Sequence, residues 1–378
     1  MQKVSIKNKL VNNIKNISGW KTNRKLLAFA VDDYGNIRLS GLEARKKLES
    51  NGVNLKSRFN QLDALDTRQD YEELFEVLES VKDKNNKSAV FTTYAMPANI
   101  DFEESIRKSS FVPENLDVTY EKLSQEDPAN YQGAFQLMQQ GIKNELLKPQ
   151  FHGREHLNIL AFNRLLEDKN AELLSNLELK CLAGIPNHQD LPKVRFSEAF
   201  SFWDKNEIET HKSIIKDGLI RFEKVYGYKP TTFTPPAMLI HPELYPFVES
   251  LGIHAIDKPR VHQVHLGNGV YQKENNTLGV QKSQNHVTIV RNCMFEPNSK
   301  NIDWVNFTFE QIKAAFFWGK PAIVSSHRVN FCGHIEPENR RKGLKTLQSL
   351  LDKVIKTWPD VEFVSVDELA GIIKETSR

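Results

Sequence analysis

The sequence predicts an α/β fold, an irregular (β/α) barrel of about seven parallel strands with long insertions. Short apolar or β-branched runs alternate along the chain with longer helical patterns, which is typical of βα units. These runs are mostly apolar rather than alternating, as in parallel strands that are buried on both faces. Polar, titratable residues stand where three of the runs end, and barrel enzymes place their catalytic groups at such ends.

Seven runs are predicted to be strands, with amphipathic helical patterns between them. The clearest helical pattern, ENRRKGLKTLQSLLDKVIKTW, precedes the last run, and YEELFEVLESVKDK precedes the second. The predicted strands are 26–33 (LLAFAVDD), 88–95 (SAVFTTYA), 148–153 (KPQFHG), 231–236 (TTFTPP), 252–257 (GIHAID), 321–327 (PAIVSSH) and 361–369 (VEFVSVDEL).

Three connections, at about 96–147, 180–215 and 258–318, are longer than ordinary βα loops. We interpret them as insertions on one barrel domain that spans residues 26–378. The third contains Asn268-Gly269, a turn signal between two runs that can pair as a hairpin.

Residues 1–25 form a separate, basic N-terminal segment with seven Lys or Arg residues and no acid. Its apolar residues recur near helical spacing, so we expect an amphipathic helix that closes the bottom of the domain. The alternative is that this helix rests on an anionic membrane surface. The apolar residues are Val4, Leu10 or Val11, Ile14 and Ile17.

The composition, 39% hydrophobic and 26% charged residues, is that of a soluble globular protein. The net charge of +3 is too small to imply a nucleic-acid partner. The N-terminus lacks a signal-peptide core, and no 18-residue apolar stretch occurs. Three widely spaced cysteines indicate reduced thiols, so a cytoplasmic protein is expected; they are Cys181, Cys293 and Cys332.

Two adjacent acids, Asp32 and Asp33, end the first predicted strand in the string AVDDYG. Burial disfavours the charged form of each carboxylate, and each carboxylate repels the other. A divalent metal would relieve this cost, with one acid as its ligand and the other left free as a base. The alternative is a strand that ends in solvent, with Asp33 capping the next element.

Two histidines four residues apart, His152 and His156, follow the third predicted strand in PQFHGREHLN. At this spacing they share one helical face, so both imidazoles can reach one ion. Pro149 and Gly153 place His152 at a strand-to-helix junction. Surface or capping histidines give the same local string, so the pair alone does not decide between a metal site and a helix start.

A third polar group, His327, ends the predicted strand PAIVSSH. Asp32, Asp33 and His152 also stand at the carboxyl ends of strands, and such ends meet at one face of a barrel. The coincidence of polar groups on three separate strands favours a functional site.

In their order along the chain, these motifs resemble those of the polysaccharide deacetylases (NodB-homology domain, carbohydrate esterase family 4). AVDDYG is similar to the family's T-F-D-D-G motif, and HGREH matches its His-x-x-x-His motif. KSAVFTTYA resembles the second strand A-T-F-F-V, AIVSSH the fifth motif, and VEFVSVDEL the closing F-V-T-L-x-E-L strand. The resemblance spans roughly residues 26–370 and implies a barrel of the glycoside hydrolase/deacetylase type.

The resemblance also implies metal-dependent removal of an acetyl or other acyl group from a sugar or polysaccharide precursor. Asp33, His152 and His156 would bind one divalent metal, usually Zn²⁺, with Co²⁺, Ni²⁺ or Mn²⁺ as alternatives. Such a ligand set leaves positions open for water and the substrate carbonyl oxygen. Asp32 would be the general base and His327 the general acid. The expected partner is a carbohydrate.

Two family motifs are incomplete in this chain. The third, Arg-x-Pro-Tyr, falls on TPPA at 234–237, which lacks the arginine that orients the base. Arg38, Arg154 or Arg291 could replace it, and the sequence does not choose among them. Asp257 corresponds to the fourth motif, whose acid supports the acid histidine in the family, but the usual tryptophan after it is missing.

Substrate contacts are expected from Pro235 and Pro236 of the third motif. Tyr94 and Trp203 could stack on a sugar ring, as could Trp304. The alternative for each aromatic residue is packing in the core, where most large aromatic side chains lie.

HGREH also fits the His-x-x-Glu-His pattern of the inverzincin metalloproteases, with Glu155 as the base. That pattern lies inside a helix, which Pro149 and Gly153 disfavour. It also leaves the adjacent acids and His327 without a role. Two further alternatives stay open: a C–N hydrolase acting on a small non-sugar amide, like the allantoinase-like members of the family, and a glycan-binding barrel without catalysis.

Overall fold

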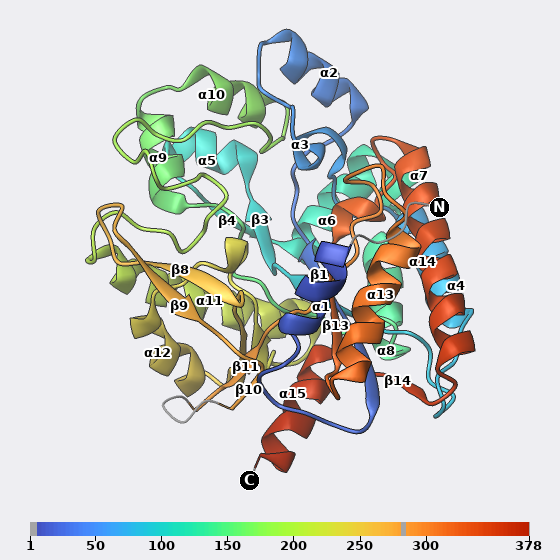
Figure 1. The fold of residues 1–378 in the computed structure, drawn as a ribbon. Coiled ribbons are helices and arrows are strands. Elements are labelled where there is room, and N and C mark those ends of the chain that lie inside the picture. The colour runs from blue at the N-terminus through green and yellow to red at the C-terminus, as the bar shows by residue number, and fades with distance from the viewer. Residues whose placement is uncertain (1–5, 281–284, 378) are drawn as a thin grey trace.

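A computed structural model describes residues 6–280 and 285–377, with side chains from residue 10 onward (Figure 1). Within them, one main sheet has the strand order β10-β11-β7-β6-β5-β2-β1-β13-β12, and β14 also pairs with β1. Apart from β10–β11, its neighbours run parallel. Its strands are β1 (Lys25–Tyr34), β2 (Phe91–Ala95), β5 (Gln150–Phe151), β6 (Thr232–Phe233), β7 (Ala255–Asp257), β10 (Gly279–Val280), β11 (Val287–Ile289), β12 (Cys293–Met294), β13 (Ala322–His327) and β14 (Val361–Phe363).

The segment 287–294 closes this sheet into a barrel. Its first part, β11, pairs with β7 at one edge, and its second part, β12, pairs with β13 at the other. Both pairings are parallel, so the segment runs in one direction while it changes partner between Ile289 and Cys293. The three residues between these strands therefore cross the seam of the barrel.

All seven predicted strands belong to the main sheet, so the predicted α/β barrel is confirmed. The last strand was predicted too long, because β14 ends at Phe363 and α15 begins at Val366. Ser365 caps that helix: its hydroxyl accepts from the Glu368 amide, and the Glu368 carboxylate accepts from the Ser365 amide. This reciprocal capping box fixes the start of the helix.

Two of the three long connections carry elements of their own. Residues 96–147 contain the pair β3 (Ala98–Ile100) and β4 (Pro113–Asn115) and several helices. Residues 258–318 contain the hairpin β8 (Val261–His265) and β9 (Tyr271–Asn275), as Asn268-Gly269 predicted, together with β10, β11 and β12 of the main sheet. The division into residues 1–25 and one barrel domain with insertions stays a prediction.

Helices surround the barrel (Figure 1). They are α1 (Ile6–Ile14), α2 (Leu42–Ser50), α3 (Arg58–Leu62), α4 (Arg68–Glu79), α5 (Phe102–Lys108), α6 (Leu116–Glu126), α7 (Pro128–Tyr131), α8 (Ala134–Lys143), α9 (Ile159–Glu167), α10 (Ala171–Glu178), α11 (Glu207–Tyr226), α12 (Tyr245–Ser250), α13 (Trp304–Phe317), α14 (Pro337–Thr357) and α15. Single 3-10 turns lie at Pro236–Met238, Pro242–Leu244 and Arg328–Asn330. None of the described helices is long and apolar enough to cross a membrane.

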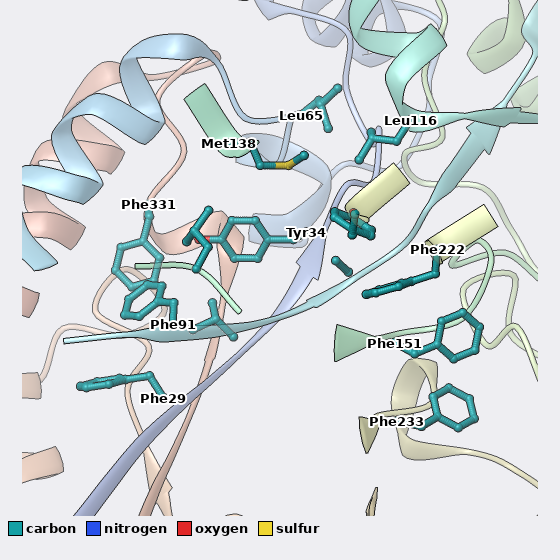
Figure 2. Close-up of a cluster of buried hydrophobic side chains, with 14 of the residues drawn as sticks. Phe29, Tyr34, Leu65, Phe91, Leu116, Met138, Phe151, Phe222, Phe233 and Phe331 are labelled. Atoms are coloured by element: carbon teal, nitrogen blue, oxygen red, sulfur yellow. The ribbon is translucent and has the colours of Figure 1, made fainter. Parts of the chain in front are cut away.

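An aromatic layer holds the strands in place (Figure 2). Phe29 and Phe91, on the neighbouring strands β1 and β2, have ring centroids 5.5 Å apart. Phe151 of β5 lies 5.0 Å from Phe233 of β6 and 6.2 Å from Phe222 of α11. Burial of each such ring contributes about 1.5–3 kcal/mol. This packing fixes the strands whose carboxyl ends carry the site.

The N-terminal helix differs from the expectation. Its polar residue Asn12 and the following Asn16 are buried against the protein, whereas Leu10, Ile14 and the following Ile17 are exposed. The neighbouring surface is polar, and Asn16 and Asn13 accept hydrogen bonds from the side chains of Asn292 and Trp318. The side of this segment that faces the protein is therefore polar, and its apolar residues are exposed. Val4 lies outside the described residues.

The three cysteines are free and buried. Cys181, Cys293 and Cys332 lie in separate parts of the chain, and no disulfide links the described residues. This agrees with the expected reduced thiols.

Candidate active site

The end of β1 turns both adjacent acids toward one cavity. In a regular strand, successive side chains point to opposite faces. Here Asp33 has a left-handed backbone, with φ of 75°, and the pairing of β1 with β2 shifts between Val31 and Tyr34. This irregularity brings Asp33 to the same cavity as Asp32.

Asp33 meets the two histidines of HGREH. Its Oδ1 atom lies 3.4 Å from Nε2 of His152 and 3.1 Å from Nε2 of His156. The potential ligand atoms of the three residues lie within 4.8 Å of one another, and all three residues are largely buried. Burial raises the pKa of Asp33, but the two imidazoles outweigh it and lower this pKa well below its usual range. Asp33 is therefore an ionised carboxylate that can bind a cation.

The tautomer of His152 suits a metal ligand. Its Nδ1 lies 2.6 Å from the carbonyl oxygen of Thr234, and a carbonyl oxygen can only accept, so Nδ1 carries the proton. In neutral His152, Nε2 then presents a lone pair toward Asp33. Among the described residues, this buried Nε2 has no hydrogen-bond partner. A cation between the lone pair and the carboxylate would satisfy both, and a carboxylate with two imidazoles is a ligand set that Zn²⁺ accepts.

The two histidines do not share a helical face as predicted. His152 follows β5 directly, as expected for a strand end, but α9 begins only at Ile159. Asn158 caps that helix by accepting from the Ala161 amide, and Gly153 has a positive φ of 100°. The imidazoles meet because the loop between strand and helix folds back, with His156 in the loop.

Of the three candidate arginines, Arg291 is the one that contacts Asp32. Its Nη1 and Nη2 atoms each donate to one Asp32 oxygen, both at 2.7 Å. Its Nε donates to Asp257, and its Nη2 also contacts the hydroxyl of Thr234 at 3.2 Å. Arg291 stands in the three-residue crossing between β11 and β12, so the seam of the barrel delivers it to the site. This bidentate pair orients Asp32.

The other two candidate arginines serve elsewhere. Arg154 pairs with Glu155 and with Asp217, 2.9 Å away. Arg38 lines the cavity, but its Nε lies 3.4 Å from Asp63, and none of its recorded contacts is with Asp32.

His327 is supported by Glu296, not by Asp257 as expected. Nδ1 of His327 donates to Glu296 at 2.6 Å, and Glu296 is held by Asn330 at 2.8 Å and by Arg58. Burial lowers the pKa of His327, but Glu296 and the two aspartates raise it to about 9. The expectation for Asp257 differs because this carboxylate is occupied by Arg291.

Asp32 and His327, the expected base and acid, lie side by side. Asp32 and His327 are register partners on β1 and β13, and Nε2 of His327 lies 3.9 Å from an Asp32 oxygen. Both line the cavity that also contains Asp33 and the two histidines. The predicted convergence of strand ends is therefore present in the structure.

The cavity has a volume of about 680 Å³. Its lining differs in part from the expected substrate contacts, because Pro235 belongs to it but Pro236, Tyr94 and Trp203 do not. Tyr94 is fully buried, and its ring packs 5.2 Å from the Arg291 guanidinium. Trp203 packs against a small core cluster, and Trp304 is also buried. The aromatic residues that do line the cavity are Phe59 and Phe196.

Glu155 does not have the position that a metalloprotease base needs. It is buried, pairs with Arg154, and does not line the cavity. Burial raises its pKa. HGREH also lies in a loop, so the inverzincin alternative is wrong.

Glu296 is the main site residue that the sequence interpretation missed. It follows β12 in the string CMFEP, an apolar run that ends in an acid. That is the signal by which Asp32 and His327 were found. Glu296 lies inside residues 258–318, which the sequence predicts to be an insertion, so this signal does not mark it as a site residue.

Neither a protein-family model nor a curated protein matches this sequence. Among solved structures, the chain is similar to Puue allantoinase, with a TM-score of 0.50 and 10% identity over 97% of each chain. A candidate glycoside hydrolase/deacetylase from Parabacteroides distasonis has a TM-score of 0.50 and 9% identity over 94% of this chain and 72% of that one. A candidate polysaccharide deacetylase from Mycobacterium smegmatis has a TM-score of 0.45 and 10% identity over 95% and 94% of the two chains. The likeness to the first two confirms the resemblance at the level of fold: this chain is a (β/α) barrel of the glycoside hydrolase/deacetylase type.

Proposed function

We propose that this protein is a metal-dependent deacetylase that hydrolyses an N-acetyl or other acyl group of a sugar or polysaccharide precursor. One observation carries the proposal: a single cavity contains an Asp-His-His ligand set, a carboxylate held by arginine and an imidazole held by glutamate. Amide hydrolysis needs a polarised carbonyl, a base for water and an acid for the leaving amine. The three groups correspond to these three needs.

Asp33, His152 and His156 would hold the metal ion. Once bound, a divalent ion lowers the pKa of water and polarises the substrate carbonyl. Zn²⁺ is the ion we expect, and Co²⁺, Ni²⁺ or Mn²⁺ also accept such donors. The Thr234 carbonyl fixes His152 with Nε2 directed to the ion.

Asp32 is the proposed general base. Arg291 binds both of its oxygens, which fixes the plane of the carboxylate. Each oxygen retains a lone pair, so Asp32 can accept the proton of a water molecule whose oxygen attacks the acyl carbon.

His327 is the proposed general acid. With a pKa of about 9, it is protonated near neutral pH. Glu296 binds the Nδ1 proton, which leaves the Nε2 proton for the leaving nitrogen. Transfer of this proton accompanies cleavage of the C–N bond and gives a free amine and a carboxylic acid.

The cavity lining supports a sugar substrate. A volume of about 680 Å³ lies inside the range of about 300–1,000 Å³ that is usual for ligand pockets. Its polar lining can bind hydroxyl groups, and Phe59 and Phe196 offer apolar faces for a sugar ring. The polar residues include Asn36, Asn60, Asn187 and Ser197.

A second candidate function is hydrolysis of a small cyclic, non-sugar amide. The likeness to an allantoinase over 97% of both chains favours it. The arginine-held base also argues against the non-catalytic glycan-binding alternative, since a pure binding site has little use for a base beside a ligand set.

The test combines metal content with substrate choice. Elemental analysis of the wild type should give about one divalent ion per chain. Asp33→Ala and His152→Ala should lose it, and His254→Ala, which changes an exposed histidine, should keep it. The metal-loaded enzyme should release acetate from N-acetylated sugars and leave allantoin intact. Ring opening of allantoin without deacetylation would establish the second candidate, and wild type that takes up no metal would refute both.

A further inference from the structure

The N-terminal helix α1 presents its apolar face to solvent. Leu10, Val11, Ile14 and the following Ile17 are 49–59% exposed. Leu10, Ile14 and Ile17 follow helical spacing and so lie on one side. An amphipathic helix in a globular protein usually buries this face, so the orientation of α1 needs a cause.

Polar contacts on the opposite side hold α1 in this orientation. Asn16 is 1% exposed, and its Oδ1 accepts from Asn292 at 2.8 Å. Lys15 donates to Gln311 of α13 at 3.0 Å. The following residues are also tied to the barrel, because the backbone amide of Trp20 donates to Leu278 at 2.8 Å. Rolling the helix over to bury its apolar face would break these bonds.

The surface beside α1 also exposes apolar and basic side chains; Figure 1 shows that α13 lies next to α1. Phe317 is 77% exposed and precedes Trp318, whose indole donates to Asn13 at 2.8 Å. Met294 is half exposed, and its amide donates to Gln311, the partner of Lys15. Lys21 is exposed, as is Lys313, one helical turn before Phe317.

We propose that the α1 face, formed by Leu10, Val11, Ile14, Ile17, Met294 and Phe317, docks on the surface of an anionic lipid bilayer. An interfacial helix buries apolar side chains at the acyl boundary while neighbouring lysines reach anionic headgroups. Residues 1–25 contain seven basic residues and no acid. Lys15, Arg24 and Lys25 already bind Gln311, Glu362 and Asp360. The exposed Lys21 and Lys313 are the described basic groups that complement such a surface. Pairing with a second copy would place these same positive charges against each other across a two-fold axis. Charge therefore favours the bilayer over self-association.

Co-sedimentation with vesicles tests the proposal on the full chain. Wild type should bind vesicles of equal parts phosphatidylglycerol and phosphatidylcholine, and should bind phosphatidylcholine alone about tenfold more weakly. High salt should release it. The double variant Leu10→Ser/Ile14→Ser should bind anionic vesicles at least about tenfold more weakly, because it removes apolar groups that enter the bilayer.

Ile220→Ser is the matched control, because Ile220 is 60% exposed on α11, away from α1. It should bind like wild type. Circular dichroism should show equal folding of all variants, since exposed positions are changed. Wild type that stays in the supernatant with anionic vesicles at low salt would overturn the proposal. So would a wild-type dimer that the double variant converts to a monomer without a change in vesicle binding.

Discussion

The two halves of the candidate site differ in how they are encoded. The ligand half, Asp33, His152 and His156, comes from two short strings that can be read directly from the sequence. The support half consists of Arg291, in the segment that closes the barrel seam, and Glu296, which follows that segment. Both lie in a region that looks like an insertion in the sequence. The candidate ligands thus belong to local motifs, whereas the side chains that hold Asp32 and His327 in place depend on how distant segments meet.

The difference has a physical origin. A metal needs several donors within a few ångströms, so ligands tend to stand close to the ends of adjacent strands. An orienting side chain such as that of Arg291 is long and can approach from any wall of the cavity. Its position in the sequence is therefore less constrained than that of the group it orients.

Asp32→Asn should have the largest effect, and it should distinguish metal binding by the ligand half from catalysis by the base that Arg291 holds. We expect kcat to fall by about 10³-fold, because the variant loses its general base. Metal content should stay at the wild-type level, since Asp32 is outside the ligand set. Kinetics and elemental analysis on the same preparation check both statements. Full activity of this variant would refute the assigned mechanism. Loss of metal would show that Asp32 also contributes to metal binding.

Arg291→Lys tests whether the seam residue supports the base. Lysine cannot make the bidentate contact, so we expect kcat to fall by about 10²-fold. Urea unfolding should show a lower stability, because Asp32 and Asp257 lose part of a buried ion pair whose full disruption costs roughly 3–5 kcal/mol. Arg154→Lys, which alters a pair outside the cavity, is the control and should change kcat less than about twofold. Equal losses in both variants would argue against a special role for Arg291.

Glu296→Gln should change the pH dependence more than the maximal rate. Glu296, together with Asp33 and Asp32, raises the pKa of His327 to about 9, so removal of the Glu296 charge should lower that pKa toward 6.5. A general acid must be protonated, and the loss of kcat at high pH should therefore begin about 1–2 units lower. At pH 8 the variant should be roughly tenfold slower than wild type, with near-normal rates at pH 6. An unshifted basic limb would show that Glu296 does not control the acid.

Glu155→Gln should have the smallest effect. Glu155 contacts neither the cavity nor the ligand set, so metal content should not change and kcat should stay within about threefold of wild type. The assay is the same deacetylation measurement. Abolished hydrolysis would restore the metalloprotease alternative and place the base in HGREH.

Much of the fold followed from local patterns. Each predicted strand is a short apolar run that the main sheet indeed contains, because parallel strands buried on both faces require such runs. The acids and histidines at strand ends were found by the same reasoning. The capping serine Ser365 also ended the last strand early, a local signal that the apolar run obscured.

What could not be predicted depends on long-range contacts. The sequence offers three arginines that could orient Asp32 and does not choose among them. Arg291 reaches Asp32 because β11 pairs with β7 and β12 pairs with β13, which places the residues between them at the seam of the barrel. The sequence predicts that Asp257 supports His327, but Glu296 does so instead. Which carboxylate reaches His327 depends on their positions in space, and Asp257 is bound to Arg291. The outward face of α1 reverses the usual rule, since its polar side is tied to Asn292.

The left-handed backbone of Asp33 implies an exchange of stability for function. A residue with a side chain costs roughly 1–2 kcal/mol in this conformation, whereas glycine adopts it freely. A barrel optimised only for folding would therefore have glycine at this position. The present chain keeps a carboxylate there, and Asp33→Gly should yield a more heat-resistant but inert protein. Efforts to stabilise this scaffold should start elsewhere and leave this position unchanged.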